Sequence, residues 1–345
     1  MRLLFIKLKH IGDALLLTPT LKAVREVYPQ AQIWVVVREG TQGILEGCPQ
    51  IDRLLTAPAP EKGRRRVRDW CSQIQLVQEL RREKFDIAFE LSDGDRGRWL
   101  AWLSGASVRV ATRHYVRVNW VARRAITRFS DAAWTGGHRV EKDYGLVREC
   151  LDLPEAPPGL VFTENRSHFP PSLAGFSRCV VFHPSTRWAR KRWPVELWVR
   201  LGKQMQSRGL RVLVSCGPDA EERAVADAIC EGVGGGIAST GGATRWAELA
   251  GVLYRAALFV GVDTAAMHLA AACQCPTVAI FGPSVPRFWR PWRTSCRLIS
   301  APESELALAR PDFLEAVSRT SAASVPYDRV LAACEELLSA QPVVA

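Results

Sequence analysis

The chain of 345 residues has no uncharged apolar run approaching the roughly 20 residues that a membrane-spanning helix needs. It also has no CxxC pair. Its ten cysteines are scattered, with Cys273 and Cys275 the nearest two, so no zinc or other metal site is predicted. The first residues, MRLLFIKLKHIGD, interrupt their apolar side chains with Lys7 and Lys9, unlike a signal peptide. These absences exclude a polytopic membrane protein and favour a cytosolic globular chain.

Acidic side chains are scarce in the first part of the chain. The whole sequence has 46 basic and 35 acidic side chains and a net charge of +11, and residues 1–150 carry 26 of the bases and 17 of the acids. From Arg96 to Arg128 there are eight arginines and no acid. Charge of one sign favours a polyanionic partner, such as nucleic acid, anionic lipid or a phosphorylated glycan. A solvated basic surface explains the charge equally well, so both interpretations stay open.

Strand-like apolar runs alternate with helical periodicity along most of the chain. We expect strands at 3–8, 33–37, 85–90, 179–183, 212–216, 258–262 and 277–281, and helices at 15–28, 68–83, 194–206, 220–230 and 328–338. This alternation predicts an α/β fold with doubly wound parallel sheets. The proline-rich segment LDLPEAPPGL, residues 151–160, divides it into two Rossmann-like halves with a cleft between them.

The predicted domains follow from that division. We place the first domain at residues 1–155, a linker at 156–172, the second domain at 173–325, and a final helix at 326–345 that returns to the first domain. Sheets of this kind bind ligands at the carboxyl ends of their strands. Polar residues that directly follow a predicted strand are therefore the candidates for a site.

Asp13 follows the first predicted strand and a glycine turn, in the segment KLKHIGDALLLTP. A carboxylate at a helix start is stabilised by the helix dipole, so Asp13 can be an ordinary capping acid. At the carboxyl end of a strand it can instead act as a general base. The segment alone leaves both roles open.

A second segment, HPSTRWARKRWP at residues 183–194, follows another predicted strand. Its hydroxyls are Ser185 and Thr186, and four cations follow them within six residues. Hydroxyl donors and countercharge together are what a phosphate group requires. The pattern favours a phosphate-binding loop over a solvated basic loop.

The third segment, FVGVDTAAMHLAAACQ, runs from a strand into Asp263 and Thr264 and then into a helix of small residues. Small side chains allow a ligand to approach the backbone, whose first N–H groups favour an anion. His268 lies one turn into that helix. The pattern predicts a cradle for a diphosphate. Two other segments are set aside, because GVGGGIASTGG (232–242) is interpreted as a flexible loop and Asp93-Gly94-Asp95 as a capped turn.

Taken together and in order, these segments and CGPDAEE resemble the lipopolysaccharide heptosyltransferase family, glycosyltransferase family 9, across nearly the whole chain. The segment LKHIGDALLLTP is most similar to the heptosyltransferase III branch. The resemblance implies a GT-B fold and an inverting, metal-independent transfer of heptose from ADP-heptose to the inner core of lipopolysaccharide. It also implies that no cofactor is needed. We further expect a monomer that lies peripherally at the cytoplasmic face of the inner membrane and does not bind nucleic acid.

Carried over position by position, the resemblance makes Asp13 the base and assigns the donor site. That site comprises the hydroxyl pair Ser185 and Thr186, the phosphate-binding Lys191, the ribose-binding Glu221, the sugar-binding Asp263, and a cradle of Thr264, Ala265, Ala266, Met267 and His268. Two departures leave details open. The loop before Lys191 is one residue longer than in some members, so Arg190 can take the role of Lys191. Ala265 stands where many members have glycine.

For the acceptor we expect the basic residues of the first domain, namely Lys7, Lys9, His10, Arg96, Arg98, Arg113 and Arg117. Other readings stay open. A family relative can transfer a different sugar or act as heptosyltransferase I or II, and a non-catalytic basic protein would bind nucleic acid, although no nucleic-acid motif is present.

Overall fold

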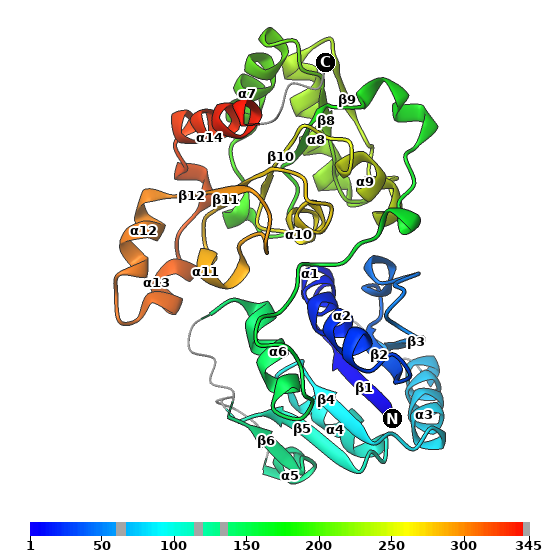
Figure 1. Ribbon diagram of the computed structural model, residues 1–345. Helices are drawn as coiled ribbons and strands as arrows, with labels where there is room; N and C mark the ends of the chain where they lie inside the picture. The colour runs from blue at the N-terminus through cyan, green and yellow to red at the C-terminus, as the bar shows by residue number, and fades with distance from the viewer. Residues whose placement is uncertain (60–66, 114–119, 132–136, 341–345) are drawn as a thin grey trace. The chain divides into compact units, whose positions relative to one another are not determined.

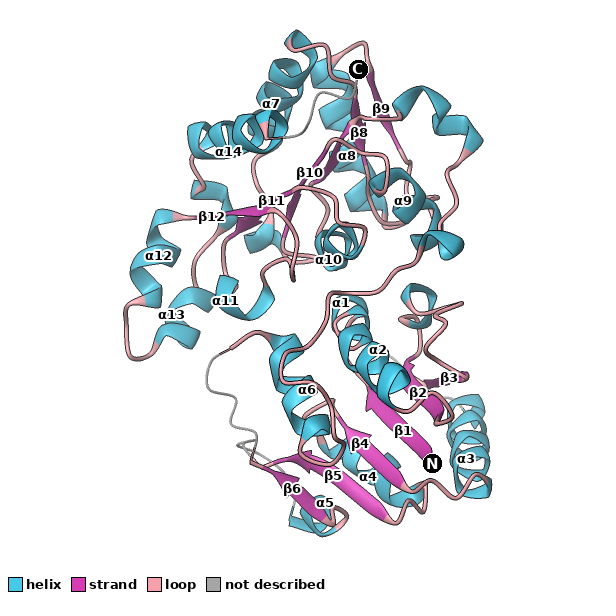
Figure 2. Ribbon diagram, viewed as in Figure 1, coloured by secondary structure: helices cyan, strands magenta, loops and turns pink. Residues whose placement is uncertain are grey.

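The structure is a computed structural model that describes residues 1–59, 67–113, 120–131 and 137–340. The chain divides into two compact units, Met1–Val161 and Phe162–Ala345. Each contains one six-stranded sheet in which all strands are parallel, as the ribbon diagrams show (Figures 1 and 2). Among the described residues, none of the helices combines the length and the hydropathy that a membrane-spanning segment requires.

Unit 1 has the strand order β3-β2-β1-β4-β5-β6. Its strands are β1 (Arg2–Lys7), β2 (Gln32–Arg38), β3 (Arg53–Ala57), β4 (Ile87–Glu90), β5 (Val108–Thr112) and β6 (Arg128–Ser130). Its helices are α1 (Ile11–Leu15), α2 (Thr18–Val27), α3 (Val67–Arg82), α4 (Asp95–Leu103), α5 (Trp120–Arg124), α6 (Arg139–Arg148) and the 3-10 turn η1 (Gln42–Ile44). Helices α2 and α6 contact each other on one face of the sheet, while α3, α4 and α5 form the layer on the other face (Figure 1).

Unit 2 repeats the arrangement with the order β12-β11-β10-β7-β8-β9. Its strands are β7 (Val180–His183), β8 (Val212–Val214), β9 (Ile237–Ser239), β10 (Leu258–Val262), β11 (Thr277–Phe281) and β12 (Cys296–Ser300). Its helices are α7 (Val195–Ser207), α8 (Ala220–Val233), α9 (Trp246–Leu253), α10 (Ala265–Ala272), α11 (Pro286–Trp289), α12 (Pro302–Leu308), α13 (Phe313–Ser318) and α14 (Tyr327–Ser339), with 3-10 turns η2 (Glu164–Arg166), η3 (Pro171–Phe176), η4 (Ala189–Lys191) and η5 (Ala322–Ser324).

The predicted helix 15–28 is broken in the structure into α1 and α2. Pro19 is the second residue of α2, and proline has no N–H to continue a helix from the preceding turn. The Thr18 hydroxyl instead donates to the Leu15 carbonyl at 2.8 Å. Asp13 therefore lies in a separate, five-residue helix directly after β1.

One further expectation differs from the structure. The glycine-rich segment 232–242, predicted to be a loop, contains the edge strand β9, which pairs with β8. The final helix α14 packs on unit 2, where its apolar residues Val330, Cys334 and Leu337 lie in the core.

The proline-rich segment is anchored to unit 1 as far as Val161. The Tyr144 hydroxyl donates to the Pro154 carbonyl at 2.7 Å, and the Val161 N–H donates to the Thr18 hydroxyl at 3.0 Å. The boundary between the units falls after Val161. This position lies inside the segment 156–172, for which the sequence predicts a linker.

The core of unit 2 depends on Trp198 in α7. Its ring is fully buried and lies 5.1 Å from the rings of both Phe182 and Trp193. We expect Trp198→Ala to lower the free energy of unfolding by about 3–5 kcal/mol, because it leaves a large cavity between the helix and the sheet. Urea denaturation followed by circular dichroism measures this. Leu306→Ala is the control, since Leu306 is 75% exposed and its truncation should change stability by less than about 0.5 kcal/mol.

Candidate active site

The same topological feature occurs in both units. The chain starts each sheet at a central strand, β1 or β7, builds outward on one side, and then begins the other side at β4 or β10. The connections that follow these two neighbouring strands leave toward opposite faces of the sheet. Such a switch point opens a crevice at the carboxyl ends of the strands, where ligands of doubly wound sheets bind. The residues that follow β1, β4, β7 and β10 are therefore the candidates for ligand binding.

Asp13 lies at the switch point of unit 1, six residues after the end of β1. Its carboxyl group is buried, with 6% of the residue exposed. One oxygen, Oδ2, accepts the His10 N–H at 3.3 Å, and the other, Oδ1, has no hydrogen-bond partner in the protein. A buried acceptor without a partner is costly, and such atoms concentrate at functional sites.

Lys7, the last residue of β1, forms a buried ion pair with Asp143 of α6. Burial by itself would lower the pKa of Lys7, but the carboxylates of Asp143 and Asp13 outweigh it and raise that pKa above its usual value. Lys7 therefore stays charged next to Asp13. Only 3% of Lys7 is exposed, so it lies within the site and not on the open surface.

Asp93, which follows β4, collects the other cations of this edge. Lys142 Nζ lies 2.6 Å and Lys9 Nζ 3.0 Å from its carboxylate, and an Arg139 nitrogen lies at 3.6 Å. Burial would raise the pKa of Asp93, but Lys142 and Lys9 hold it far below its usual range. Asp93 also has a φ of +57°, a left-handed conformation that only Asn, Asp and Gly adopt readily. The turn predicted here is present, and its acid is the centre of a charge cluster that the sequence did not reveal.

Glu90, the last residue of β4, is a second buried acid that sequence analysis missed. Burial, with the charge of Asp93, raises its pKa to about 7. Its Oε1 accepts the Ser92 N–H at 2.8 Å, and its Oε2 has no hydrogen-bond partner. The Ser92 hydroxyl in turn accepts the Leu8 N–H at 2.7 Å, which joins the ends of β4 and β1.

The predicted acceptor arginines do not form one surface. Arg98 is 1% exposed and donates to the Thr112 carbonyl at 3.0 Å, so its assignment to an accessible binding surface is wrong. Arg96 is exposed and donates to the Pro58 carbonyl and to Gln73. Arg113 is exposed and pairs with Asp131, and Arg117 lies outside the described residues. Lys9 is partly exposed and His10 is exposed, at the edge where Asp13 lies.

In unit 2, the central contact of the switch point is the ion pair between Lys191 and Asp263. Lys191 Nζ lies 2.6 Å from Asp263 Oδ2 and 3.2 Å from the Asp263 carbonyl oxygen. Asp263 is the first residue after β10, and Lys191 comes from the loop that follows β7. Arg190, the alternative to this lysine, donates instead to the Ser318 carbonyl at 3.1 Å. The structure thus brings together Lys191 and Asp263, which lie 72 residues apart.

The loop after β7 also holds the predicted hydroxyl pair. Ser185 is 3% exposed, and its Oγ has no hydrogen-bond partner. Thr186 is 8% exposed, and its Oγ1 accepts the Trp188 N–H at 3.3 Å. The Trp188 ring is exposed and lies 5.2 Å from Lys191 Nζ, within reach of a cation–π contact. These contacts fix the loop over the end of β7.

Helix α10 begins directly after Asp263, with Thr264 as its N-cap. The Thr264 side chain makes no capping hydrogen bond, and the first turn of a helix presents N–H groups that can bind an anion. Ala265 is partly exposed, while Ala266, Met267 and His268 are buried. The predicted cradle can therefore act through its backbone, because the Met267 side chain is fully inside the core.

Glu221 lies apart from this ion pair, at the start of α8, and its side chain is 64% exposed. It pairs with Arg192, whose hydrogen bond lowers the pKa of Glu221. Arg192 also donates to the Thr186 carbonyl at 3.3 Å. Glu221 is thus linked to the loop after β7 through one arginine.

His183, the last residue of β7, is buried beneath this loop, and sequence analysis did not single it out. Its Nδ1 lies 2.8 Å from the Ser215 Oγ. Burial lowers the pKa of His183 to about 4, so the ring is neutral at neutral pH. A neutral, hydrogen-bonded ring supports the floor of the site without adding charge to it.

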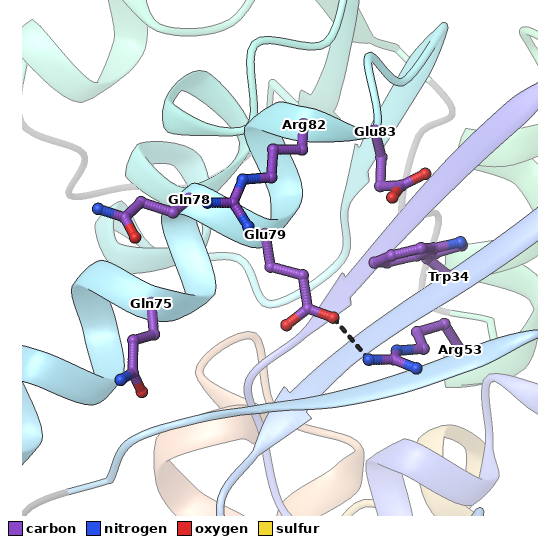
Figure 3. Close-up of a pocket in the computed structure, with 7 residues that line it drawn as sticks. All are labelled: Trp34, Arg53, Gln75, Gln78, Glu79, Arg82 and Glu83. Carbon is purple, nitrogen blue, oxygen red and sulfur yellow. Dashed lines mark hydrogen bonds and ion pairs between the residues drawn. The ribbon is translucent and has the colours of Figure 1, made fainter.

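The described residues contain no group of three or more His, Cys, Asp or Glu side chains that could hold a metal ion. They do contain a pocket of about 540 Å³ in unit 1, lined by Trp34, Arg53, Gln75, Gln78, Glu79, Arg82 and Glu83 (Figure 3). Arg53 pairs with Glu79 at 3.0 Å within it. The pocket lies between α3 and the starts of β2 and β3 and includes none of the residues at the switch point.

The chain is similar to known proteins over most of its length. The model of glycosyltransferase family 9 (heptosyltransferase) matches residues 73–315. The chain is 26% identical over 343 residues to lipopolysaccharide heptosyltransferase 3 of Escherichia coli K12, covering 96% of both chains. It is 28% identical over 298 residues to lipopolysaccharide heptosyltransferase 1 of Pseudomonas aeruginosa, covering 84% of this chain and 80% of that protein.

Solved structures share the fold over the full length. The E. coli heptosyltransferase WaaC with ADP has a TM-score of 0.81 at 20% identity, covering 98% of this chain and all of that one (100%). E. coli ADP-heptose LPS heptosyltransferase II has a TM-score of 0.74 at 20% identity, covering 98% and 99%. The two sheets thus form the GT-B fold. Because the family model spans well over half of the sequence, the chain belongs to glycosyltransferase family 9, the heptosyltransferases.

Proposed function

We propose that the chain transfers heptose from ADP-heptose to the inner core of lipopolysaccharide, with inversion at the anomeric carbon. The names of its relatives supply the substrates. The observation that supports the chemistry is the Lys191–Asp263 ion pair beside an uncapped helix start and the unpartnered Ser185 hydroxyl. Together these groups offer a diphosphate a cation, backbone N–H groups and a hydroxyl donor.

In this proposal the donor binds at the switch point of unit 2. Lys191, Ser185 and Thr186 contact the phosphates together with the backbone from Thr264 to His268. Glu221 contacts the ribose and Asp263 the heptose. As the glycosidic bond breaks, negative charge develops on the ADP leaving group, and Lys191 with the helix start stabilises it. These fixed groups supply the countercharge that a bound metal provides in other enzymes, so the proposal includes no metal.

Asp13 acts as the general base. Its free Oδ1 accepts the proton of the attacking acceptor hydroxyl while the oxygen forms its bond to the anomeric carbon. Lys7, whose pKa is raised by the carboxylates of Asp143 and Asp13, places a fixed positive charge beside the base. The proton therefore passes to the enzyme and the bonding electrons of the donor leave with ADP.

The acceptor binds to the basic edge of unit 1. Lys9 and His10 adjoin Asp13 at this edge, whereas Arg96 of α4 and Arg113 after β5 are exposed on separate elements and do not belong to it. We propose a phosphorylated glycan as the ligand, presented at the cytoplasmic face of the inner membrane, to which the enzyme binds peripherally as a monomer. Which branch of the family it represents depends on the acceptor hydroxyl.

Replacing the base should separate binding from chemistry. We expect Asp13→Asn to reduce kcat for heptose transfer by about 10²- to 10⁴-fold, because the amide cannot accept a proton. ADP should still raise the melting temperature as it does for the unchanged enzyme. Discontinuous assays of transfer and a thermal shift measure the two effects, and near-normal turnover would contradict the assignment.

The two neighbouring cations give a matched pair. We expect Lys191→Ala to weaken ADP binding about 10- to 100-fold, because it removes a charge-assisted contact and leaves Asp263 unpaired. Arg190→Ala should change the affinity less than about threefold, since Arg190 contacts the Ser318 carbonyl. Isothermal titration with ADP tests this, and equal losses in both variants would favour a general charge effect. A panel of UDP- and GDP-sugars shows whether the donor nucleotide is correct.

Salt should weaken acceptor binding. A phosphorylated core neutralised by Lys9 and surface arginines should bind less tightly as ionic strength rises and screens the charges. Enzymatic removal of the glycan phosphates should lower affinity at low salt in the same way. The KM for both acceptor forms across a salt series measures this, and identical values for the two forms would sink the proposed phosphate contacts.

A further inference from the structure

Among the described residues, large exposed apolar side chains gather on one helical layer of unit 1. They are Val67, Trp70 and Ile74 of α3, which are 79%, 55% and 54% exposed, Trp102 of α4 at 50%, and Trp120 of α5 at 66%. Of the exposed tryptophans in the part of the chain that the structure describes, Trp188 is the one that lies elsewhere. Exposed tryptophan is uncommon on a protein surface that only meets water.

On α3 these residues form one stripe. Val67, Trp70 and Ile74 are separated by three and four positions, so they lie along the same side of the helix. The core side is different, because it carries the buried Leu76 and Leu80. Helix α3 is therefore apolar on two sides, and packing against the sheet uses only one of them.

The three helices belong to the same layer. Helix α4 contacts both α3 and α5, and all three cover the sheet face opposite to α2 and α6 (Figure 1). Right-handed crossovers from β3 through β6 require this placement. The exposed side chains thus share the outward side of one layer.

The charge of this layer is mostly positive. Helices α3, α4 and α5 carry seven arginines, Arg68, Arg81, Arg82, Arg96, Arg98, Arg123 and Arg124, against three acids, Asp69, Glu79 and Asp95. Among the seven, Arg98 is buried. Arg124 lies over the ring of the exposed Trp120, with 4.9 Å from its guanidinium carbon to the ring centre. Tryptophan with arginine on one surface matches a lipid headgroup region, which is amphipathic and anionic.

We infer that the outward face of α3, α4 and α5, the lipid-facing layer, binds the surface of an anionic bilayer. Trp70, Ile74 and Trp102 enter the headgroup region, and the arginines meet lipid phosphates. The inference extends the proposed function, because it gives an enzyme with a lipid-linked acceptor its own contact to the membrane. The pocket beside α3 is separate from this face, because Trp34, Arg53 and residues of α3 other than Val67, Trp70 and Ile74 line it (Figure 3).

The test is sedimentation with vesicles. The full chain should bind vesicles containing phosphatidylglycerol and bind phosphatidylcholine vesicles much less. The triple variant Trp70→Ser, Ile74→Ser, Trp102→Ser should lose affinity for the anionic vesicles by about tenfold or more. All three positions are exposed, so its melting temperature should stay close to that of the unchanged chain. Vesicles with brominated lipid tails should quench tryptophan fluorescence of the unchanged chain more than that of the variant.

The matched control is Leu306→Ser, Leu314→Ser, which removes two exposed apolar side chains from α12 and α13 of unit 2. It should bind vesicles like the unchanged chain. Equal binding by the triple variant, or no binding of the unchanged chain to anionic vesicles, would overturn the inference. Transfer to a water-soluble, deacylated acceptor keeps the two proposals apart, because it should persist in the triple variant. Its absence from the unchanged chain would refute the proposed function and leave the vesicle result standing.

Discussion

The central strands of both sheets are buried on both faces, and this constraint determines where polar chemistry can occur. In β1, β7 and β10 nearly every residue lies in the core, so charged side chains can gather only where these strands end. The parallel pairing of β1 with β4, and of β7 with β10, brings two such ends side by side in each unit. The positions of Asp13 after β1 and of Asp263 after β10 both follow from that geometry.

The charges at these edges are neutralised in pairs. Lys7 meets Asp143, and Lys191 meets Asp263, each with little exposure to solvent. Removing one member of a buried pair leaves the other without compensation, at a cost of about 3–5 kcal/mol. Preformed pairs also hold the lysine in place before a ligand arrives, so less reorganisation is needed when it binds.

Sequence reasoning predicted the parts of the fold that are strongly periodic. The strands Leu258–Val262 and Thr277–Phe281 have the predicted bounds, and the α/β class and the family resemblance are confirmed. Edge strands such as β3 were missed because their residues are only partly buried and show no clean apolar run. The charge cluster around Asp93 was missed for another reason: Lys142 and Lys9 reach it from distant segments, and no local spacing reports such an encounter. The base role of Asp13 stays a prediction.

Several arginines of the arginine-rich stretch in unit 1 stabilise the fold through hydrogen bonds to backbone carbonyls. Arg109 donates to the carbonyls of Ala125 and Ala106, and Arg128 donates to that of Glu149. A planar guanidinium can brace two carbonyls at once, which a lysine ammonium on its flexible stem does less well. The acceptors of these hydrogen bonds are uncharged carbonyl groups, so salt in the solution weakens them very little. Some of the many arginines in this chain therefore have a structural role. Replacing them with lysine would lower the stability of unit 1 while leaving the net charge the same.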